Sequence, residues 1–229
     1  MTYVQSLSGS QVDFIGTALM PKSHGSAKVA TTRGGFKLQI RLAGLEPASQ
    51  IDPAYLTYVA WAIPTNHTNA QNLGELVLKG DDATLDTFTN LTQFALIITA
   101  EPYFAVEKPS PFVVMQNIMH LPQDDPNFVR ADLLPLRPDS KTPLEVYEAR
   151  NAVRIARSEG AERYASDTFH RALQLLQQAE NIIARKNDKA KDNPEVREKA
   201  REATLTAEAA RAAAAERLHE TDSRPAATP

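Results

Sequence analysis

The order of apolar and polar residues divides the chain into two halves with different periods. Between about residues 11 and 119, apolar residues alternate with polar ones or form short runs, as is typical of β-strands. From residue 142 they recur every three or four residues, which predicts amphipathic helices. Because the strands come first, we expect an α+β chain with an N-terminal all-β antiparallel sandwich and a C-terminal antiparallel helical hairpin or three-helix module.

The first half contains predicted strands of two kinds. Residues 36–42 alternate strictly, which predicts a strand with one buried face, and a Gly-containing link at residues 32–35 joins it to residues 26–31 in a hairpin. Residues 55–63 and 94–100 are apolar on both faces, so we expect them to be the central strands of the core.

Two further features complete the predicted sandwich. Turn-forming residues 79–82 separate residues 72–78 from residues 83–89, which predicts a second hairpin. Residues 111–119 predict a closing strand. Since no helical period interrupts these segments, the pattern favours an all-β fold over an α/β fold.

The second half opens with a helix-start signal. Residues 142–145, Thr-Pro-Leu-Glu, form a capping box with proline at the first helical position, so the first helix is expected to begin there and to end at Gly160. A second helix is predicted from Ser166 and a third from residues 193–194. Each carries one apolar stripe: Val146, Ala149, Val153 and Ala156; Phe169, Ala172, Leu176, Ala179 and Ile183; Val196, Ala200, Ala203, Ala207, Ala210, Ala214 and Leu218. Such stripes pack helix on helix.

These patterns divide the chain into four segments. We assign residues 1–120 to the sandwich domain, 121–141 to a linker, 142–220 to the helical domain, and 221–229 to a disordered tail or a further linker. The linker is marked by four prolines, Pro122, Pro126, Pro135 and Pro138.

Composition and charge restrict the classes of function. A net charge of -3 and a helical half with as many basic as acidic residues argue against a nucleic-acid partner. The absence of cysteine excludes disulfides, thiolate nucleophiles and cysteine-ligated metals. No apolar run is long enough to span a bilayer, so we expect no membrane insertion, and we expect an export leader to be missing from this sequence.

The helical half resembles a known family. Residues 160–172 read Gly-Ala-Glu-Arg-Tyr-Ala-Ser-Asp-Thr-Phe-His-Arg-Ala, and they follow Ala149, Ala152 and Ala156 and precede Leu176 and Ala179. This pattern resembles helical domains of unknown function from bacterial envelope proteins, in which a Tyr-Ala-Pro-like turn precedes the second helix. Ser166 stands at the family's proline, where a good N-cap residue is tolerated. The resemblance implies a lipoprotein or periplasmic protein, often followed by an OmpA-like peptidoglycan-binding domain, which these 229 residues do not contain.

The strand-rich half is similar to the extracytoplasmic β-sandwich of anti-sigma-K-type proteins. The similarity is carried by Gly16-Thr17-Ala18 at the start of a strand and by residues 42–47, 58–63, 72–75 and 99–102. It implies the fold and an outward-facing location. It does not imply the regulatory role, because the sequence has neither the membrane helix nor the sigma-binding helices of an anti-sigma factor.

No residues have the spacing of a metal site. The five histidines are isolated from one another: His24, His67, His120, His170 and His219. Asp81-Asp82 and Asp124-Asp125 offer carboxylates for calcium, but neither pair continues into an EF-hand pattern, so turn chemistry is the simpler interpretation. We therefore predict no metal and no cofactor.

Catalytic motifs are not apparent in the sequence. No serine lies in Gly-x-Ser-x-Gly or Ser-x-x-Lys. Gly34-Gly35 does not form a phosphate-binding loop, because it joins two predicted strands and does not open a helix. Glu101 and Glu107 flank an apolar stretch around Tyr103 that would suit a groove. The simpler interpretation is the end of a strand with exposed carboxylates, and we assign no catalytic residue.

Aromatic residues give a further choice. Trp61, Tyr55 and Tyr58 suit either a sugar-stacking platform or a buried core, and the apolar character of both faces of their strand favours the core. Asn66-His67-Thr68 and Asn90-Leu91-Thr92 match a eukaryotic glycosylation pattern, which we discount because the resemblances are bacterial.

Together these observations predict a non-catalytic structural or interaction protein of the bacterial cell envelope, in the periplasm, at the outer membrane or on the cell surface. The sandwich would bind an envelope protein or a cell-wall component, and the helices would act as spacer or anchor. The alternatives are a carbohydrate or small-ligand binding module using the aromatic strand residues, a hydrolase using Glu101 or Asp residues in loops, and a sensor of envelope signals. Any helical stripe left uncovered would allow self-association.

Overall fold

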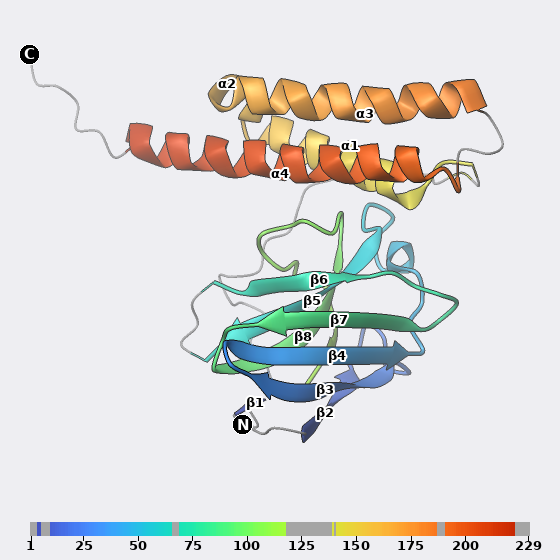
Figure 1. Cartoon of the computed structure of the whole chain (residues 1–229), viewed down its shortest axis with the longest axis vertical. Coiled ribbons are helices and arrows are strands. Elements are labelled where there is room, and N and C mark those ends of the chain that lie inside the picture. The colour runs from blue at the N-terminus through green and yellow to red at the C-terminus, as the bar shows by residue number, and fades with distance from the viewer. Residues whose placement is uncertain are drawn as a thin grey trace, which may run out of the picture. The chain divides into compact units, whose positions relative to one another are not determined.

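A computed structural model gives the fold of the chain (Figure 1). It describes residues 4–5, 10–65, 69–117, 139, 141–186 and 191–222. The chain forms two compact units, Met1–Asp132 and Leu133–Pro229, each with its own core. We call them the β unit and the helical unit. The predicted linker, residues 121–141, lies almost wholly outside the described residues.

The β unit is an antiparallel sheet whose strands form a nearly closed barrel or sandwich (Figure 1). The strands are β1 (Val4–Gln5), β2 (Ser10–Gly16), β3 (His24–Thr32), β4 (Gly35–Ala43), β5 (Thr57–Pro64), β6 (Gln71–Leu76), β7 (Ala83–Thr89), β8 (Gln93–Glu101) and β9 (Val113–Gln116), with a 3-10 turn at Ala48–Gln50. Eight of them follow the order β6-β5-β8-β9-β2-β3-β4-β7, and β1 pairs with β8. The predicted α+β fold class is therefore confirmed.

The first predicted hairpin is formed by β3 and β4. Thr32 pairs with Gly35, and no side chain larger than hydrogen fits at Gly35 because a Cβ would overlap the carbonyl oxygen of Thr89. The alternation of β4 appears as predicted, since every second residue from Phe36 to Leu42 is buried and the residues between them are exposed.

The two predicted central strands lie side by side. All residues of β5 are buried, as are all but the first of β8, and the two strands pair along their length from Thr57–Glu101 to Pro64–Phe94. Strand β9 pairs with both β8 and β2, as the predicted closing strand should. Residues 118–119 of that predicted strand lie outside the described residues.

The second predicted hairpin is wrong as a strand pair. Strand β6 pairs with β5 and β7 with β4, so they are the two ends of the sheet path, and only the isolated bridge between Lys79 and Asp82 joins their turn. Side chains link the two edges instead: Thr87 Oγ1 donates to the Leu73 carbonyl oxygen at 2.6 Å. A register shift opposite β6, between Ala60 and Trp61, marks a bulge, and bulges bend a strand and increase its twist.

The predicted strand start at residues 16–18 is also wrong. Gly16 ends β2, and a Cβ there would collide with the main chain of Met20. The chain turns back at this point because Thr17 is tied to the neighbouring β9 region: its N–H donates to the Val114 carbonyl and its hydroxyl to the Val113 carbonyl at 2.7 Å.

The helical unit contains α1 (Leu144–Ser158), α2 (Ala161–Tyr164), α3 (Ser166–Lys186) and α4 (Pro194–Asp222). The three long helices pack against one another, with α3 running antiparallel to α1 and α4 (Figure 1). The predicted stripes are buried, except that Ile183 and Leu218 at the helix ends are partly exposed. The three-helix arrangement is thus the correct alternative, with a short extra helix, α2, that was not predicted.

The predicted capping box at the start of α1 does not form. Pro143 is the N-cap residue and has no side-chain cap hydrogen bond. The Thr142 hydroxyl instead donates to Asp139 Oδ2 at 3.0 Å, while Asp139 Oδ1 accepts the N–H groups of Lys141 and Thr142 at 2.7 Å each. The Asp139 carboxylate therefore fixes the chain just before α1, because it accepts the main-chain N–H groups of the residues that precede the helix.

Candidate functional site

The most unusual titratable group of the β unit is Glu101 at the end of β8. The Ser110 N–H donates to Glu101 Oε1 at 2.7 Å, and the Thr99 hydroxyl donates to the same oxygen. Thr99 in turn accepts the Trp61 Nε1–H at 2.8 Å, and the Ser110 hydroxyl donates to the Ala100 carbonyl at 2.6 Å. Five residues, from β5, β8 and the segment after β8, thus form one buried chain of hydrogen bonds.

Glu101 is 1% exposed, so the expectation of an exposed carboxylate at this strand end is wrong. Burial raises the pKa of the Glu101 carboxyl to about 8, and the hydrogen bonds from Ser110 and Thr99 oppose that rise only in part. The group is therefore mostly protonated at neutral pH. Glu107, by contrast, is exposed, so the two glutamates do not share a site.

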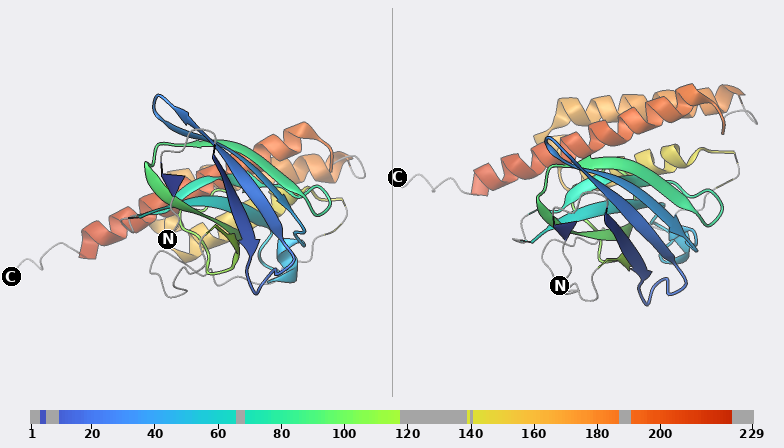
Figure 2. Two further views of the ribbon diagram at one scale, coloured as in Figure 1. Left: turned by 90° about the horizontal axis from the view of Figure 1, so that it is seen from below. Right: turned by 60° about the horizontal axis from the view of Figure 1, so that its bottom comes forward.

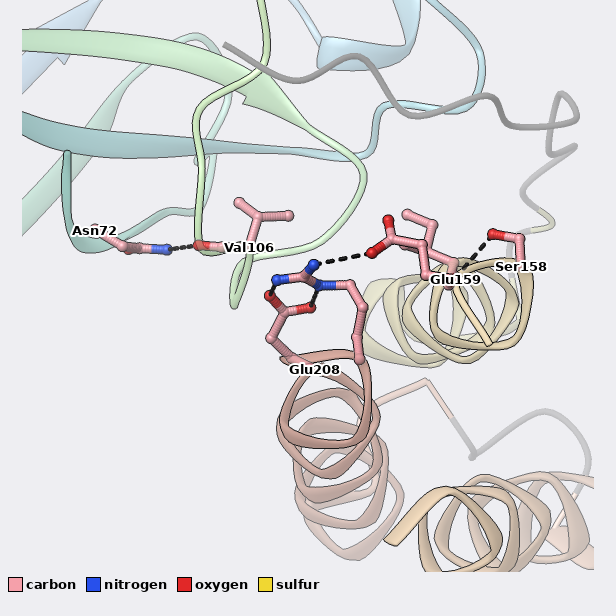
Figure 3. Close-up of polar contacts among 7 residues, drawn as sticks. Asn72, Val106, Ser158, Glu159 and Glu208 are labelled. Atoms are coloured by element: carbon pink, nitrogen blue, oxygen red, sulfur yellow. Dashed lines mark hydrogen bonds and ion pairs between the residues drawn. The ribbon is translucent and has the colours of Figure 1, made fainter. Parts of the chain in front are cut away.

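This arrangement helps to hold the segment between β8 and β9 in place. Asn72 Nδ2, on β6, donates to the carbonyl oxygens of Phe104 and Val106 at 2.9 Å each. Figure 3 shows the contact with Val106. Ser110 is held at the far end of the same segment by Glu101 and Ala100. Both ends of this segment are therefore tied to the sheet, one through Asn72 and the other through Glu101 and Ala100.

The aromatic residues proposed as a ligand platform lie in the core. Trp61, Tyr55 and Tyr58 are each at most 1% exposed. The Tyr58 hydroxyl donates to the Glu46 carbonyl at 2.6 Å, and burial, followed by the charge of Glu46, raises the pKa of Tyr58. The prediction that these side chains build the core is confirmed, and a sugar-stacking surface made from them is not present.

The histidines and aspartates that the structure describes do not gather into a metal site. Among the described residues there is no group of three or more His, Cys, Asp or Glu side chains placed to hold a metal. His24 and His170 make local contacts, with the Lys22 carbonyl and the Ser166 carbonyl respectively, and Asp81-Asp82 lie in the turn before β7. His67, His120, Asp124-Asp125 and the Asn66 glycosylation triplet lie outside the described residues.

The helical unit contains a polar cluster that sequence reasoning missed. Arg211, on α4, donates to both carboxylate oxygens of Glu208, at 2.9 and 3.0 Å, and to Glu159 Oε2 at 2.9 Å (Figure 3). Burial alone would lower the pKa of Arg211, but hydrogen bonds and charge from Glu208 and then Glu159 raise it overall. The signal was the i,i+3 spacing of Glu208 and Arg211 next to the alanine stripe. The cluster fixes the end of α1 to α4.

The face most suited to binding is the outer surface of β2, β3, β4 and β7, which we call the outer sheet face. Figure 2 shows β2, β3 and β4, in blue, side by side. Pairing places its exposed side chains in three rows: Gln11, Lys28, Gln39 and Asp86; Asp13, Ser26, Arg41 and Thr84; Ala30, Lys37 and Phe88. The face combines charges, amides, hydroxyls and one half-exposed aromatic ring. Within these rows, the Gln11 side-chain amide donates to Asp13 Oδ1 at 2.9 Å.

Phe88 also has a structural task on this face. Its ring lies close to Gly34 and Gly35, such that a Cβ at Gly35 would stand 2.9 Å from the ring edge. An aromatic side chain over a strand glycine covers backbone that would otherwise be exposed. One part of the Phe88 ring therefore covers the β3–β4 turn, while the side chain as a whole remains 48% exposed.

Comparison with known proteins gives one family. Residues 145–225 are similar to the family described as a domain of unknown function, DUF4398, and this span covers the helices α1 to α4 almost from end to end. No curated protein and no solved structure matches the chain. None of the helices in the described part of the chain combines the length and the apolar composition needed to cross a membrane.

Proposed function

We propose that the protein is a non-catalytic structural or interaction protein of the bacterial cell envelope. The β unit would bind a protein or a cell-wall component, and the helical unit would act as spacer or anchor. One observation carries the proposal: the β unit keeps Glu101, Trp61, Tyr55 and Tyr58 in its interior and presents polar and charged side chains on the outer sheet face. Such a face offers charged and hydrogen-bonding groups to a partner.

The proposed location rests on sequence similarity. Residues 160–172 resemble helical domains of envelope proteins, and the match of residues 145–225 to DUF4398 supports a distinct helical domain in that region. The similarity of the strand-rich half to anti-sigma-K-type sandwiches leads to the same expectation for the β unit. The protein is accordingly proposed to lie in the periplasm or at the cell surface.

Two measurements test the proposal. In a bacterium that encodes the protein, fractionation followed by immunodetection should place it with periplasmic or envelope material. The purified full chain should also co-sediment saturably with envelope fractions or with purified peptidoglycan, and an excess of unlabelled chain should displace it. Recovery in the cytosol, or retention that neither saturates nor is displaced, would overturn the proposal. Glu101→Gln is the matched control, because an interior change should leave retention unaltered.

A further inference from the structure

The β3–β4 hairpin concentrates the positive charge of the β unit. Residues 24–43 carry four of the seven Lys and Arg residues found between residues 10 and 117, and none of the nine Asp and Glu residues. The four are Lys28, Arg33, Lys37 and Arg41, and all are exposed. The uneven distribution gives an otherwise acidic unit one basic surface, which we call the basic strip.

Strand pairing orders the basic strip along the hairpin. Arg41 pairs with Ser26, Gln39 with Lys28, and Lys37 with Ala30, so each successive row of the outer face holds one cation. Arg33 continues the series in the turn at the tip. Rows two residues apart on a strand are separated by about 6.8 Å. The strip is therefore a ladder of positive charges with that repeat.

The strip rests on a fixed support. The alternate residues of β4, Phe36, Leu38, Ile40 and Leu42, are all buried, and β4 pairs on both sides, with β3 and with β7. In the described part of the chain, no carboxylate forms an ion pair with any of the four cations. The pairing of β3 and β4 thus holds the cations in a fixed order.

Carboxylates border the strip on both sides. Asp13, on β2, lies in the row of Ser26 and Arg41, and Asp86, on β7, lies in the row of Lys28 and Gln39. These charges repel an anion that spreads sideways onto the neighbouring strands, so they favour a narrow ligand aligned with the hairpin.

We propose that the basic strip binds an extended acidic polypeptide segment, aligned with β3 and β4. This inference rests on the proposed function and names the partner class of the β unit. Alternate side chains of an extended peptide project to one side with a repeat of about 6.8 Å, which matches the ladder of cations. Gln39 and Ser26, between the cations, can hydrogen-bond to the ligand's polar groups.

The test uses the full chain and a fluorescent twelve-residue peptide of alternating Glu and Thr. Binding is expected at low salt and should weaken as salt is raised, because exposed charges are screened. The variant Lys28→Gln/Lys37→Gln/Arg41→Gln should bind at least ten-fold more weakly. The variant Lys22→Gln/Lys79→Gln/Lys108→Gln removes the same charge from exposed lysines elsewhere and should stay within about two-fold of the parent.

Three results would overturn the inference. They are no binding of the peptide by the parent chain, an equal loss of peptide affinity in both triple variants, or tighter binding of oligothymidylate than of the peptide. Circular dichroism would establish that both variants are folded. Retention of the strip variant by envelope fractions separates the two proposals. If that retention persists while peptide binding is absent, the envelope function stands and the partner class is wrong.

Discussion

Two buried carboxyl groups, one in each unit of this protein, are neutralised in opposite ways. In the β unit, Glu101 is held by a hydroxyl and a main-chain N–H, and it stays protonated because burial raises its pKa to about 8. In the helical unit, Glu208 is 7% exposed and receives two hydrogen bonds from the cation of Arg211. One carboxyl is neutralised by a proton and the other by a guanidinium.

This difference determines how each unit should respond to solution conditions. A proton is lost as pH rises, whereas a guanidinium keeps its charge throughout the range in which proteins are studied. The β unit should therefore be sensitive to pH through Glu101, and the helical unit should be sensitive to removal of a single cation. Trp61, the only tryptophan, lies in the β unit and reports on it by fluorescence, while far-UV circular dichroism is dominated by the helices.

The largest expected effect is the pH dependence of the β unit. Because the folded-state pKa of Glu101 is raised above its ordinary value of 4.5, the folded state binds a proton that the unfolded state has lost between those two values. Stability must then fall as pH rises, by about 1.4 kcal/mol per pH unit at most, or roughly 3 kcal/mol between pH 5.5 and 7.5. Urea unfolding followed by Trp61 fluorescence measures this slope.

Two variants isolate the contribution of Glu101. Glu101→Gln keeps the shape and an acceptor oxygen but cannot ionise, so its stability should be nearly constant over the same pH range. Glu107→Gln removes an exposed carboxylate from the same segment and should keep the slope of the parent. Equal slopes in the parent and Glu101→Gln would mean that Glu101 is already ionised in the folded state.

Removal of the guanidinium should produce the second largest effect. Arg211→Met leaves Glu208 without its two hydrogen bonds from Arg211 and releases Glu159 at the end of α1. We expect the helical unit to lose about 2 kcal/mol of unfolding free energy, measured by far-UV circular dichroism in urea. The loss arises because the buried carboxylate of Glu208 would no longer be compensated by the guanidinium of Arg211.

The matched variant for this position is Arg211→Lys. Lysine restores the charge but not the planar donor group that binds both oxygens of Glu208, so the loss should be roughly half as large. If Arg211→Met also shifts the unfolding transition seen by Trp61 fluorescence, the two units unfold together, and the contrast between them no longer holds for stability.

Most of the fold could be predicted because local periodicity reports burial directly. The alternation of residues 36–42 and the stripes of the three long helices appear in the structure as the sequence indicated. The strands that β6 and β7 pair with could not be predicted. The turn at residues 79–82 reverses the chain but does not determine which strands become neighbours, and β6 pairs with β5 while β7 pairs with β4. The capping box failed because Asp139, three residues earlier, takes the Thr142 hydroxyl.

The polar sites were harder to predict than the fold. Glu101 follows an apolar strand, which suggested solvent at the strand end, but its partner Ser110 lies nine residues away in an irregular segment. Irregular segments carry no period from which such a contact can be inferred. The basic strip has a visible signal, the absence of acidic residues from 24 to 43, but only the register of β3 and β4 orders its cations into rows.

The hydrogen bonds of Asn72 involve no charged group, and their removal should have an effect of intermediate size. Asn72 donates to the carbonyls of Phe104 and Val106, and its own Oδ1 accepts the Gly74 N–H at 2.9 Å. Asn72→Ala should destabilise the β unit by about 1–2 kcal/mol and accelerate amide hydrogen exchange in residues 103–107. Neither effect should depend on salt, because no charge is involved. Asn90→Ala, at an exposed position, should leave exchange in that segment unchanged.

The smallest expected effect comes from an exposed ion pair of the helical unit. Arg171 Nη2 lies 3.2 Å from Glu202 Oε1, but the Arg171 side chain is 68% exposed, and Lys199 Nζ remains 3.5 Å from the other oxygen of Glu202. Arg171→Met should therefore shift the thermal midpoint of the helical unit by less than about 2 °C, and by nothing measurable in 1 M salt. A shift as large as that of Arg211→Met would mean that the Arg171–Glu202 and Arg211–Glu208 pairs contribute equally despite their different exposure. Charge alone, rather than the burial of Glu208, would then determine how much such a pair stabilises these helices.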